Sequence, residues 1–119
     1  MSSSPIILLV EDNPADAELL EMALEETGII TAEEPLRVVT DGQQAVDFLF
    51  QRGAYKGSPR PDFILLDLNL PKMDGREVLA EIKASDDLKI IPVAVLTSSQ
   101  AEEDVLRAYR LYANCYLRK

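Results

Sequence analysis

The sequence predicts an α/β domain built on a parallel sheet that helices cover on both faces. Short apolar segments alternate with amphipathic segments along all 119 residues. Five apolar segments are candidate strands: Ile6 to Val10, Leu36 to Val39, Phe63 to Leu66, Pro92 to Leu96 and Cys115 to Leu117. The first, third and fourth are almost continuous Ile, Leu and Val, which is typical of parallel strands buried on both faces. Repeated strand–helix units of this kind form a parallel sheet with right-handed crossovers.

Helix-start signals separate these strands. Asn13 is a candidate N-cap followed by a proline at the first helical position. The segments 41–44, 74–77 and 99–102 fit the capping-box spacing strictly or loosely, and Gly28 is a natural stop for the first helix. The residues expected on the buried helix faces are Leu19, Leu20, Ala23 and Leu24; Ala45, Val46 and Leu49; Val78, Leu79 and Ile82; and Val105, Leu106 and Tyr109.

Two further features concern the connections and the end of the chain. The segment 51–61 contains two glycines and two prolines and predicts an extended loop. A covering helix is expected after the fifth strand, but the sequence stops at Lys119. We therefore expect either one bare sheet face or a chain shortened at its C-terminus, within one domain spanning residues 1–119.

Composition excludes several classes of function. Acidic residues outnumber basic ones by 21 to 12, and a nucleic-acid surface would need a basic patch. The apolar segments are too short to cross a bilayer and no signal peptide is present, so a cytoplasmic protein is expected. The chain has no histidine, which removes His-based acid–base catalysis and His-ligated metals, and its single cysteine cannot form an internal disulfide.

Polar residues follow four of the predicted strands. They are Glu11 and Asp12 after the first strand, Asp67 after the third, Thr97 (with Ser98) after the fourth and Lys119 after the fifth. Ligands of open α/β sheets bind outside the carboxyl ends of the strands, so the fold would gather these groups at one edge. Taken singly, Glu11-Asp12 is equally a helix-start signal, Thr97 a strand-end residue and Lys119 a solvated terminus. Their convergence on one edge favours a functional site.

The repulsion between the three carboxylates must be offset by another interaction. Two of them about 4 Å apart repel by roughly 4 kcal/mol at an effective dielectric constant near 20. Proton uptake is one remedy and a divalent cation is the other, and oxygen ligands without His or Cys favour Mg²⁺. A carboxylate beside such a metal, here Asp67, can attack phosphorus and form an aspartyl phosphate. Mg²⁺ held by Asp12, Asp67 and Glu11 through water, together with Lys119 and Thr97, would stabilise the phosphoryl oxygens.

With these residues located, the sequence resembles the receiver domain of two-component response regulators. The resemblance extends from Ile6 to Lys119 and rests on four motifs in family-like order and spacing. They are Leu9-Val10-Glu11-Asp12-Asn13, the string from Leu65 to Gly75 around Asp67, Val95-Leu96-Thr97-Ser98, and Cys115-Tyr116-Leu117-Arg118-Lys119. The resemblance implies a flavodoxin-like sheet of order 2-1-3-4-5, with the last helix of the family absent from this chain.

The resemblance also implies a role for each site residue. Asp67 corresponds to the phosphoacceptor, which a histidine kinase phosphorylates, and Glu11 and Asp12 to the acidic pair that holds Mg²⁺. Asn69 stands where the family supplies a backbone carbonyl to the metal. Thr97 corresponds to the hydroxyl residue that moves toward the phosphoryl oxygens on activation. Tyr116 corresponds to the aromatic residue that turns inward as the hydroxyl moves, and Lys119 to the lysine that pairs with the phosphate.

Three features are similar to single-domain regulators that accompany bacterial phytochrome kinases: the long 51–61 loop, the Leu-Asn-Leu-Pro-Lys string at 68–72 and the Asn-Cys-Tyr ending. A phytochrome kinase and a second copy of the chain are therefore candidate partners.

Two alternative functions are a receiver-like scaffold that is not phosphorylated and a haloacid-dehalogenase-type phosphatase. The phosphatase would need an acid two residues after the nucleophile, where this chain has Asn69. The intact set of Asp12, Asp67, Thr97 and Lys119 disfavours a scaffold, so the sequence favours a self-phosphorylating signalling domain over an enzyme that turns over substrates.

Overall fold

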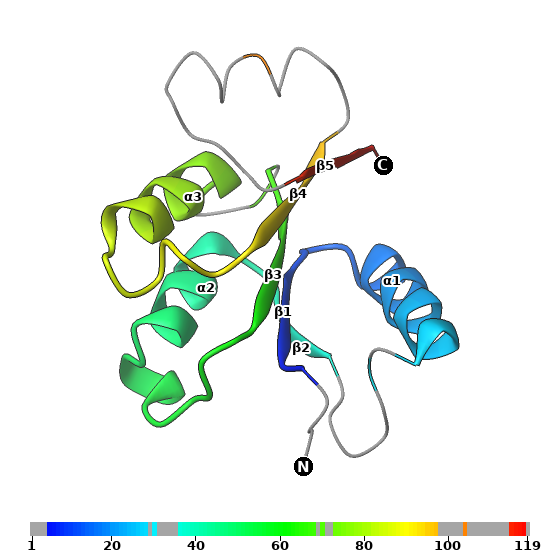
Figure 1. Ribbon diagram of the computed structural model, residues 1–119, viewed down its shortest axis with the longest axis horizontal. Helices are drawn as coiled ribbons and strands as arrows, with labels where there is room; N and C mark the ends of the chain where they lie inside the picture. Colours follow the sequence, from blue (N-terminus) through cyan, green and yellow to red (C-terminus); the bar gives the residue numbers. More distant parts are fainter. Residues whose placement is uncertain are drawn as a thin grey trace.

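A computed structural model describes residues 5–28, 30, 36–68, 70, 73–97, 104 and 115–118 of the chain. The centre of the molecule is a parallel sheet, drawn edge-on in Figure 1. Its strands are β1 (Ile7–Val10), β2 (Arg37–Val39), β3 (Phe63–Asp67), β4 (Val93–Thr97) and β5 (Cys115–Arg118). The spatial order is β2-β1-β3-β4-β5, so the chain crosses over β1 after β2 and all carboxyl ends meet at one edge.

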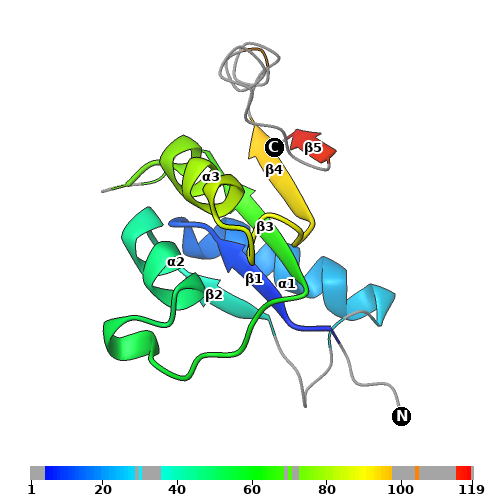
Figure 2. The same cartoon turned by 60° about the vertical axis from the view of Figure 1, so that its left-hand side comes forward.

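Among the described residues, three helices cover the two faces of the sheet. They are α1 (Pro14–Thr27), α2 (Gly42–Leu49) and α3 (Gly75–Ala84). Figures 1 and 2 show α1 on one face, with α2 and α3 side by side on the other. Apolar side chains of β1 and β3 alternate between the two layers: Leu8 and Ile64 join the α2–α3 core, while Leu9 and Leu65 join the α1 core. Both cores therefore depend on the same central strands.

The three helices begin where the sequence predicts. Asn13 accepts hydrogen bonds from the amides of Ala15 and Asp16 at 2.9 and 3.3 Å, and the α1 C-cap is Gly28 with φ of 78°. Asp41 accepts from the Gln44 amide at 2.7 Å. Each capping bond satisfies an amide that has no partner within its helix. The caps thereby fix where the chain turns back after β1 and after β2.

The buried faces of α2 and α3 are those predicted, but that of α1 differs. Leu20 and Leu24 pack on the sheet, whereas Leu19 is 64% exposed and Ala23 is also exposed. The prediction for Leu19 and Ala23 is therefore wrong. Ala17 is the only buried residue of the helix, and positions three and seven residues further along lie on the same face.

The long connection between α2 and β3 is more ordered than an extended loop. It contains a turn of 3-10 helix, η1 (Gly53–Tyr55). Its end is tied back to α2, because the Ser58 hydroxyl donates to the Phe48 carbonyl at 2.8 Å and the Gln51 side chain donates to the Ser58 carbonyl at 2.6 Å. The Tyr55 ring packs against Phe48 with centroids 5.6 Å apart.

The structure confirms the predicted α/β class, the parallel order β2-β1-β3-β4 and the first three helices. The helix predicted over 99–109 lies outside the described residues except for Asp104. Within the described part of the chain, none of the helices combines the length and hydropathy that a membrane crossing requires.

Candidate functional site

Two buried carboxylates stand at the ends of the two central strands. Val10 of β1 pairs with Leu66 of β3, so Glu11 and Asp67 follow at the same level of the sheet. Each side chain is only 1% exposed. The Glu11 amide donates to the Val39 carbonyl at 3.0 Å, which extends the pairing of β1 with β2 to the first residue of the site. The sheet itself therefore sets the distance between these two acids.

A third carboxylate joins them from the solvent side. Asp12 is exposed, and it follows Glu11 directly. Glu11, Asp12 and Asp67 each offer one carboxylate oxygen, and these three oxygens lie within 4.8 Å of one another. The predicted convergence of the acids on one sheet edge is confirmed for these three residues.

The Glu11 side chain is oriented by the start of α1. The Asn13 amide donates to Glu11 Oε1 at 3.2 Å, while the Asn13 side chain caps the helix. One turn of chain thus links the capping of α1 to the position of a site carboxylate.

The loop after Asp67 closes back onto the strand. The Leu68 amide donates to the Leu96 carbonyl at 3.4 Å, and the Gly75 amide donates to the Leu68 carbonyl at 3.0 Å. Asp74 caps α3 by accepting from the amides of Arg76 and Glu77 at 2.8 and 3.1 Å. The first residue of α3 consequently lies against the backbone that carries Asp67.

The other predicted site residues are placed only in part. Asp67 pairs with Leu96, so Thr97 lies one residue further along β4, opposite Arg118 of β5. Tyr116 pairs with Val95. Asn69, Lys119 and the side chains of Thr97 and Tyr116 lie outside the described residues, so their roles remain predictions.

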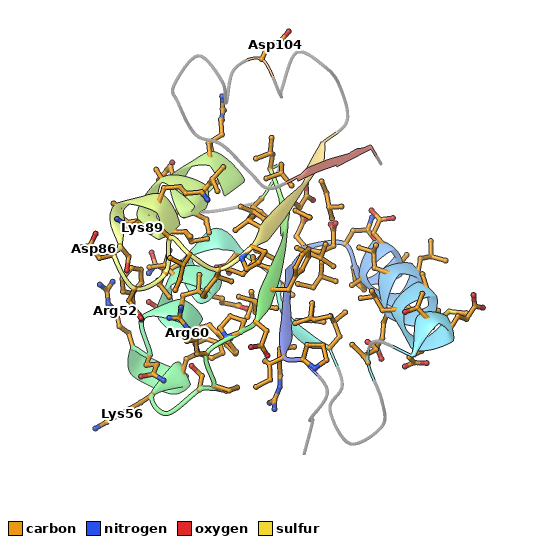
Figure 3. The ribbon with its side chains drawn as sticks, viewed as in Figure 1. Arg52, Lys56, Arg60, Asp86, Lys89 and Asp104 are labelled. Atoms are coloured by element: carbon orange, nitrogen blue, oxygen red, sulfur yellow. The ribbon has the colours of Figure 1, made fainter. Side chains whose placement is uncertain are left out.

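Several basic side chains are engaged away from the acidic group. Figure 3 shows Arg52, Lys56 and Arg60 along the α2–η1 side of the molecule. Arg60 forms an ion pair with Asp87 at 2.9 Å, and Arg52 lies over the Phe50 ring at 4.8 Å from its centroid. Lys89 pairs with Asp86 at 2.9 Å in the turn after α3. None of these four side chains is positioned to neutralise the three carboxylates.

The donor set fits a hard divalent cation. Three carboxylate oxygens within reach of one another, with no nitrogen or sulfur ligand among them, suit Mg²⁺ or Mn²⁺. Asp12 leaves the group open to solvent, so water or a phosphate oxygen could complete the coordination. The arrangement therefore combines a candidate nucleophile, Asp67, with a candidate metal site.

Sequence reasoning missed two glycines that shape this edge. Gly42 and Gly75 are buried first residues of α2 and α3. A Cβ on either one would come within 3.0 Å of backbone atoms, those of Met73 and of Asp67–Leu68 respectively. A detectable signal existed, since glycine replaces better helix formers directly after an aspartate cap in both helices.

A parallel α/β sheet with three carboxylates at its carboxyl edge suits a class of protein that binds a metal ion or a phosphoryl group. Comparison with known families narrows that class, because residues 7–119 match the response regulator receiver domain. The chain belongs to this family. It is a receiver domain of a two-component response regulator and not a conventional enzyme.

Similar proteins include the response regulator Rcp1 and the phytochrome response regulator RcpA. Response regulator Rcp1 of Synechocystis sp. (strain ATCC 27184 / PCC 6803 / Kazusa) is 55% identical over 114 residues, which cover 96% of this chain and 76% of Rcp1. The crystal structure of the Mn²⁺-bound form of Rcp1 is 56% identical with a TM-score of 0.84, and covers 97% of this chain and 81% of that one. The phosphorylated cyanobacterial phytochrome response regulator RcpA is 50% identical with a TM-score of 0.81, and covers 98% and 81%.

Proposed function

We propose that Asp67 is the phosphoacceptor of this receiver domain. The observation that carries the proposal is the meeting of Glu11, Asp12 and Asp67 within 4.8 Å at the carboxyl edge of the sheet. Asp67 is the member that ends the central strand β3, where a rigid backbone holds the nucleophile. The similarity to the phosphorylated regulator RcpA supports the same assignment.

The phosphoryl donor is a phosphohistidine of a histidine kinase. A carboxylate oxygen of Asp67 attacks phosphorus and forms a P–O bond while the P–N bond to the imidazole breaks. The imidazole leaves with that electron pair and takes up a proton. Residues 1–119 contain no histidine, so the donor lies outside them.

Glu11, Asp12, Asp67 and the backbone carbonyl of Asn69 would hold Mg²⁺ in this site. The cation supplies charge neutralisation for the phosphoryl oxygens during transfer. The chain's own contribution is to fix the carboxylates: the β1–β3 pairing sets Glu11 beside Asp67, and the Asn13 amide orients Glu11. The similarity to the Mn²⁺-bound form of Rcp1 supports a divalent cation here.

The proposal gives roles in the response to phosphorylation to three further residues, Lys119, Thr97 and Tyr116. Lys119 pairs with the phosphoryl group as a point charge, and the Thr97 hydroxyl moves to donate to a phosphoryl oxygen. Tyr116 turns inward with Thr97 and changes the partner-binding face formed by the fourth helix and β5. To shift the protein from mostly the inactive conformation to mostly the active one, phosphorylation must stabilise the active conformation by about 5.5 kcal/mol more than the inactive one.

The partner is a histidine kinase of the phytochrome type, by similarity to the phytochrome response regulator RcpA. We further propose that residues 1–119 form one receiver domain that acts in the cytoplasm, and that a helix over 99–109 completes a flavodoxin-like, doubly wound fold. A second copy of the chain is a candidate partner of the β5 side of the sheet.

The test is phosphorylation by acetyl phosphate, followed by intact mass measurement with and without Mg²⁺. The wild-type protein should gain one phosphoryl group only when Mg²⁺ is present, and Asp67→Asn should gain none. Unchanged labelling of Asp67→Asn, or no labelling of the wild type, would contradict the proposal.

A matched control lies at the other end of the same strand. Asp62 immediately precedes β3, is exposed, and accepts a hydrogen bond from the Ile6 amide at 2.8 Å. Asp62→Asn removes one negative charge but leaves the carboxyl edge of the sheet intact. It should therefore be labelled at the wild-type rate.

A further inference from the structure

We propose that Gly42, the first residue of α2, is a positioning residue for the metal and phosphoacceptor site. The inference rests on the proposed function of Asp67 and deepens it. Gly42 has no part in the acidic group, yet it contacts the loop that follows Asp67.

Gly42 is required for space and not for backbone torsion. The glycines with positive φ are Gly28, Gly53 and Gly57, at 78°, 54° and 84°. Gly42 is absent from that group, so an alanine could adopt its backbone conformation, and alanine is the better helix former. The glycine at position 42 is therefore explained by the atoms packed around it.

Those surroundings are the backbone of the β3–α3 loop. A Cβ at position 42 would lie within 3.0 Å of the Met73 carbonyl oxygen, carbonyl carbon and Cβ. A flexible side chain could swing aside, but a carbonyl group moves only with its peptide unit. An added methyl group therefore displaces the chain at Met73.

Displacement at Met73 is passed on to Asp67. Gly75, two residues later, packs so closely that its own Cβ would meet the Asp67 carbonyl oxygen and Leu68 Cα. The Gly75 amide also donates to the Leu68 carbonyl at 3.0 Å, so both ends of the loop are held together. A shift of the chain at Met73 is therefore transmitted through Gly75 to the backbone of Asp67 and Leu68.

The other side of Gly42 is fixed to Glu11. The Val39 carbonyl accepts from the Glu11 amide at 3.0 Å, and Asp41, only 5% exposed, caps α2 by accepting from the Gln44 amide at 2.7 Å. The start of α2 thus lies between the chain that holds Glu11 and the loop that follows Asp67. Gly42 therefore sets how closely the start of α2 approaches the loop that follows Asp67, and through that loop the position of the Asp67 backbone.

The first experiment compares Gly42→Ala with Gly28→Ala by calorimetric Mg²⁺ titration at a temperature where both are folded by circular dichroism. Gly28 caps α1 with positive φ, and a Cβ there meets nothing within 4 Å, so this variant controls for lost stability. We expect at least a tenfold weaker Mg²⁺ affinity and slower acetyl phosphate labelling for Gly42→Ala. Gly28→Ala should stay within twofold of the wild type. Wild-type Mg²⁺ affinity in folded Gly42→Ala would overturn the inference, while a wild type that fails to label would instead overturn the proposed function.

The second experiment needs no variant and holds even if Gly42→Ala does not fold. The chain has five glycines, so protein labelled with ¹⁵N-glycine gives five backbone amide signals. Saturation with Mg²⁺ should shift the Gly42 and Gly75 signals, while those of Gly28, Gly53 and Gly57 stay in place as internal controls. An unmoved Gly42 signal at saturating Mg²⁺ would overturn the inference.

Discussion

The backbone amide of Asn13 donates to Glu11 Oε1 at 3.2 Å, while the Asn13 side chain caps α1. A single residue therefore serves both the start of a helix and the orientation of a buried acid. The two tasks use different groups of Asn13, and substitution can separate them.

Asn13→Ala should lower the free energy of unfolding by about 1 kcal/mol, because the amides of Ala15 and Asp16 lose their acceptor. Urea denaturation followed by circular dichroism measures the change. Asn13→Asp keeps an acceptor at the cap and should retain most of the stability. Equal losses in the two variants would contradict the capping role.

Asp67→Asn should stabilise the metal-free protein. Its carboxylate shares a 4.8 Å cluster with Glu11 and Asp12, and removing one charge relieves repulsion of about 1 to 3 kcal/mol. The wild type should gain stability on adding Mg²⁺, by about 2.7 kcal/mol at a hundred times the dissociation constant, and the variant should gain less. Thermal unfolding with and without Mg²⁺ gives both quantities.

The control for this prediction is Glu81→Gln on the exposed face of α3, which removes the same charge outside the cluster. It should respond to Mg²⁺ as the wild type does. If Glu81→Gln stabilises the metal-free protein as much as Asp67→Asn, general charge reduction is the cause and local repulsion is not.

The acidic site could be predicted because it follows from strand ends. Glu11 and Asp67 each stand directly after an apolar run, and a parallel sheet brings such positions together whatever their separation in sequence. Helix starts were equally predictable, since Asn13, Asp41 and Asp74 act on amides two or three residues away. Both inferences need only local patterns and one topological rule.

The missed features depend on contacts between distant parts of the chain. The exposure of Leu19 follows from how Ala17 seats α1 on the sheet, and several leucines of α1 would satisfy a helical period equally well. The order of the 51–61 loop comes from the bond of Ser58 to the Phe48 carbonyl. The space that Gly42 needs is set by the Met73 backbone. Of these relations only the one at Gly42 left a local signal, a glycine directly after the Asp41 cap, and even there the contact with Met73 cannot be predicted from a local pattern.

Ile82→Ala should be strongly destabilising. Ile82 is fully buried in the α2–α3 core, so truncation leaves a cavity and should cost about 2 to 5 kcal/mol. Ile90→Ala is the matched control, because Ile90 is 72% exposed and its truncation should change stability by less than about 0.5 kcal/mol. Urea midpoints for both variants check the burial assigned to α3, and similar losses would contradict it.

Thr97→Ala should separate phosphorylation from its readout. Thr97 ends β4 opposite Arg118, and Tyr116 lies two residues earlier on the neighbouring strand, so a displacement at Thr97 can pass directly to β5. The variant should still be labelled on Asp67, because the nucleophile and the three carboxylates are unchanged. It should lose the phosphorylation-dependent shifts of the Cys115–Arg118 amide signals, and with them phosphorylation-dependent partner binding.

The matched control is Thr40→Ala, which removes a hydroxyl at the carboxyl end of the edge strand β2 and should keep these shifts. Full β5 shifts in phosphorylated Thr97→Ala would refute the switch and leave the phosphoacceptor role of Asp67 standing.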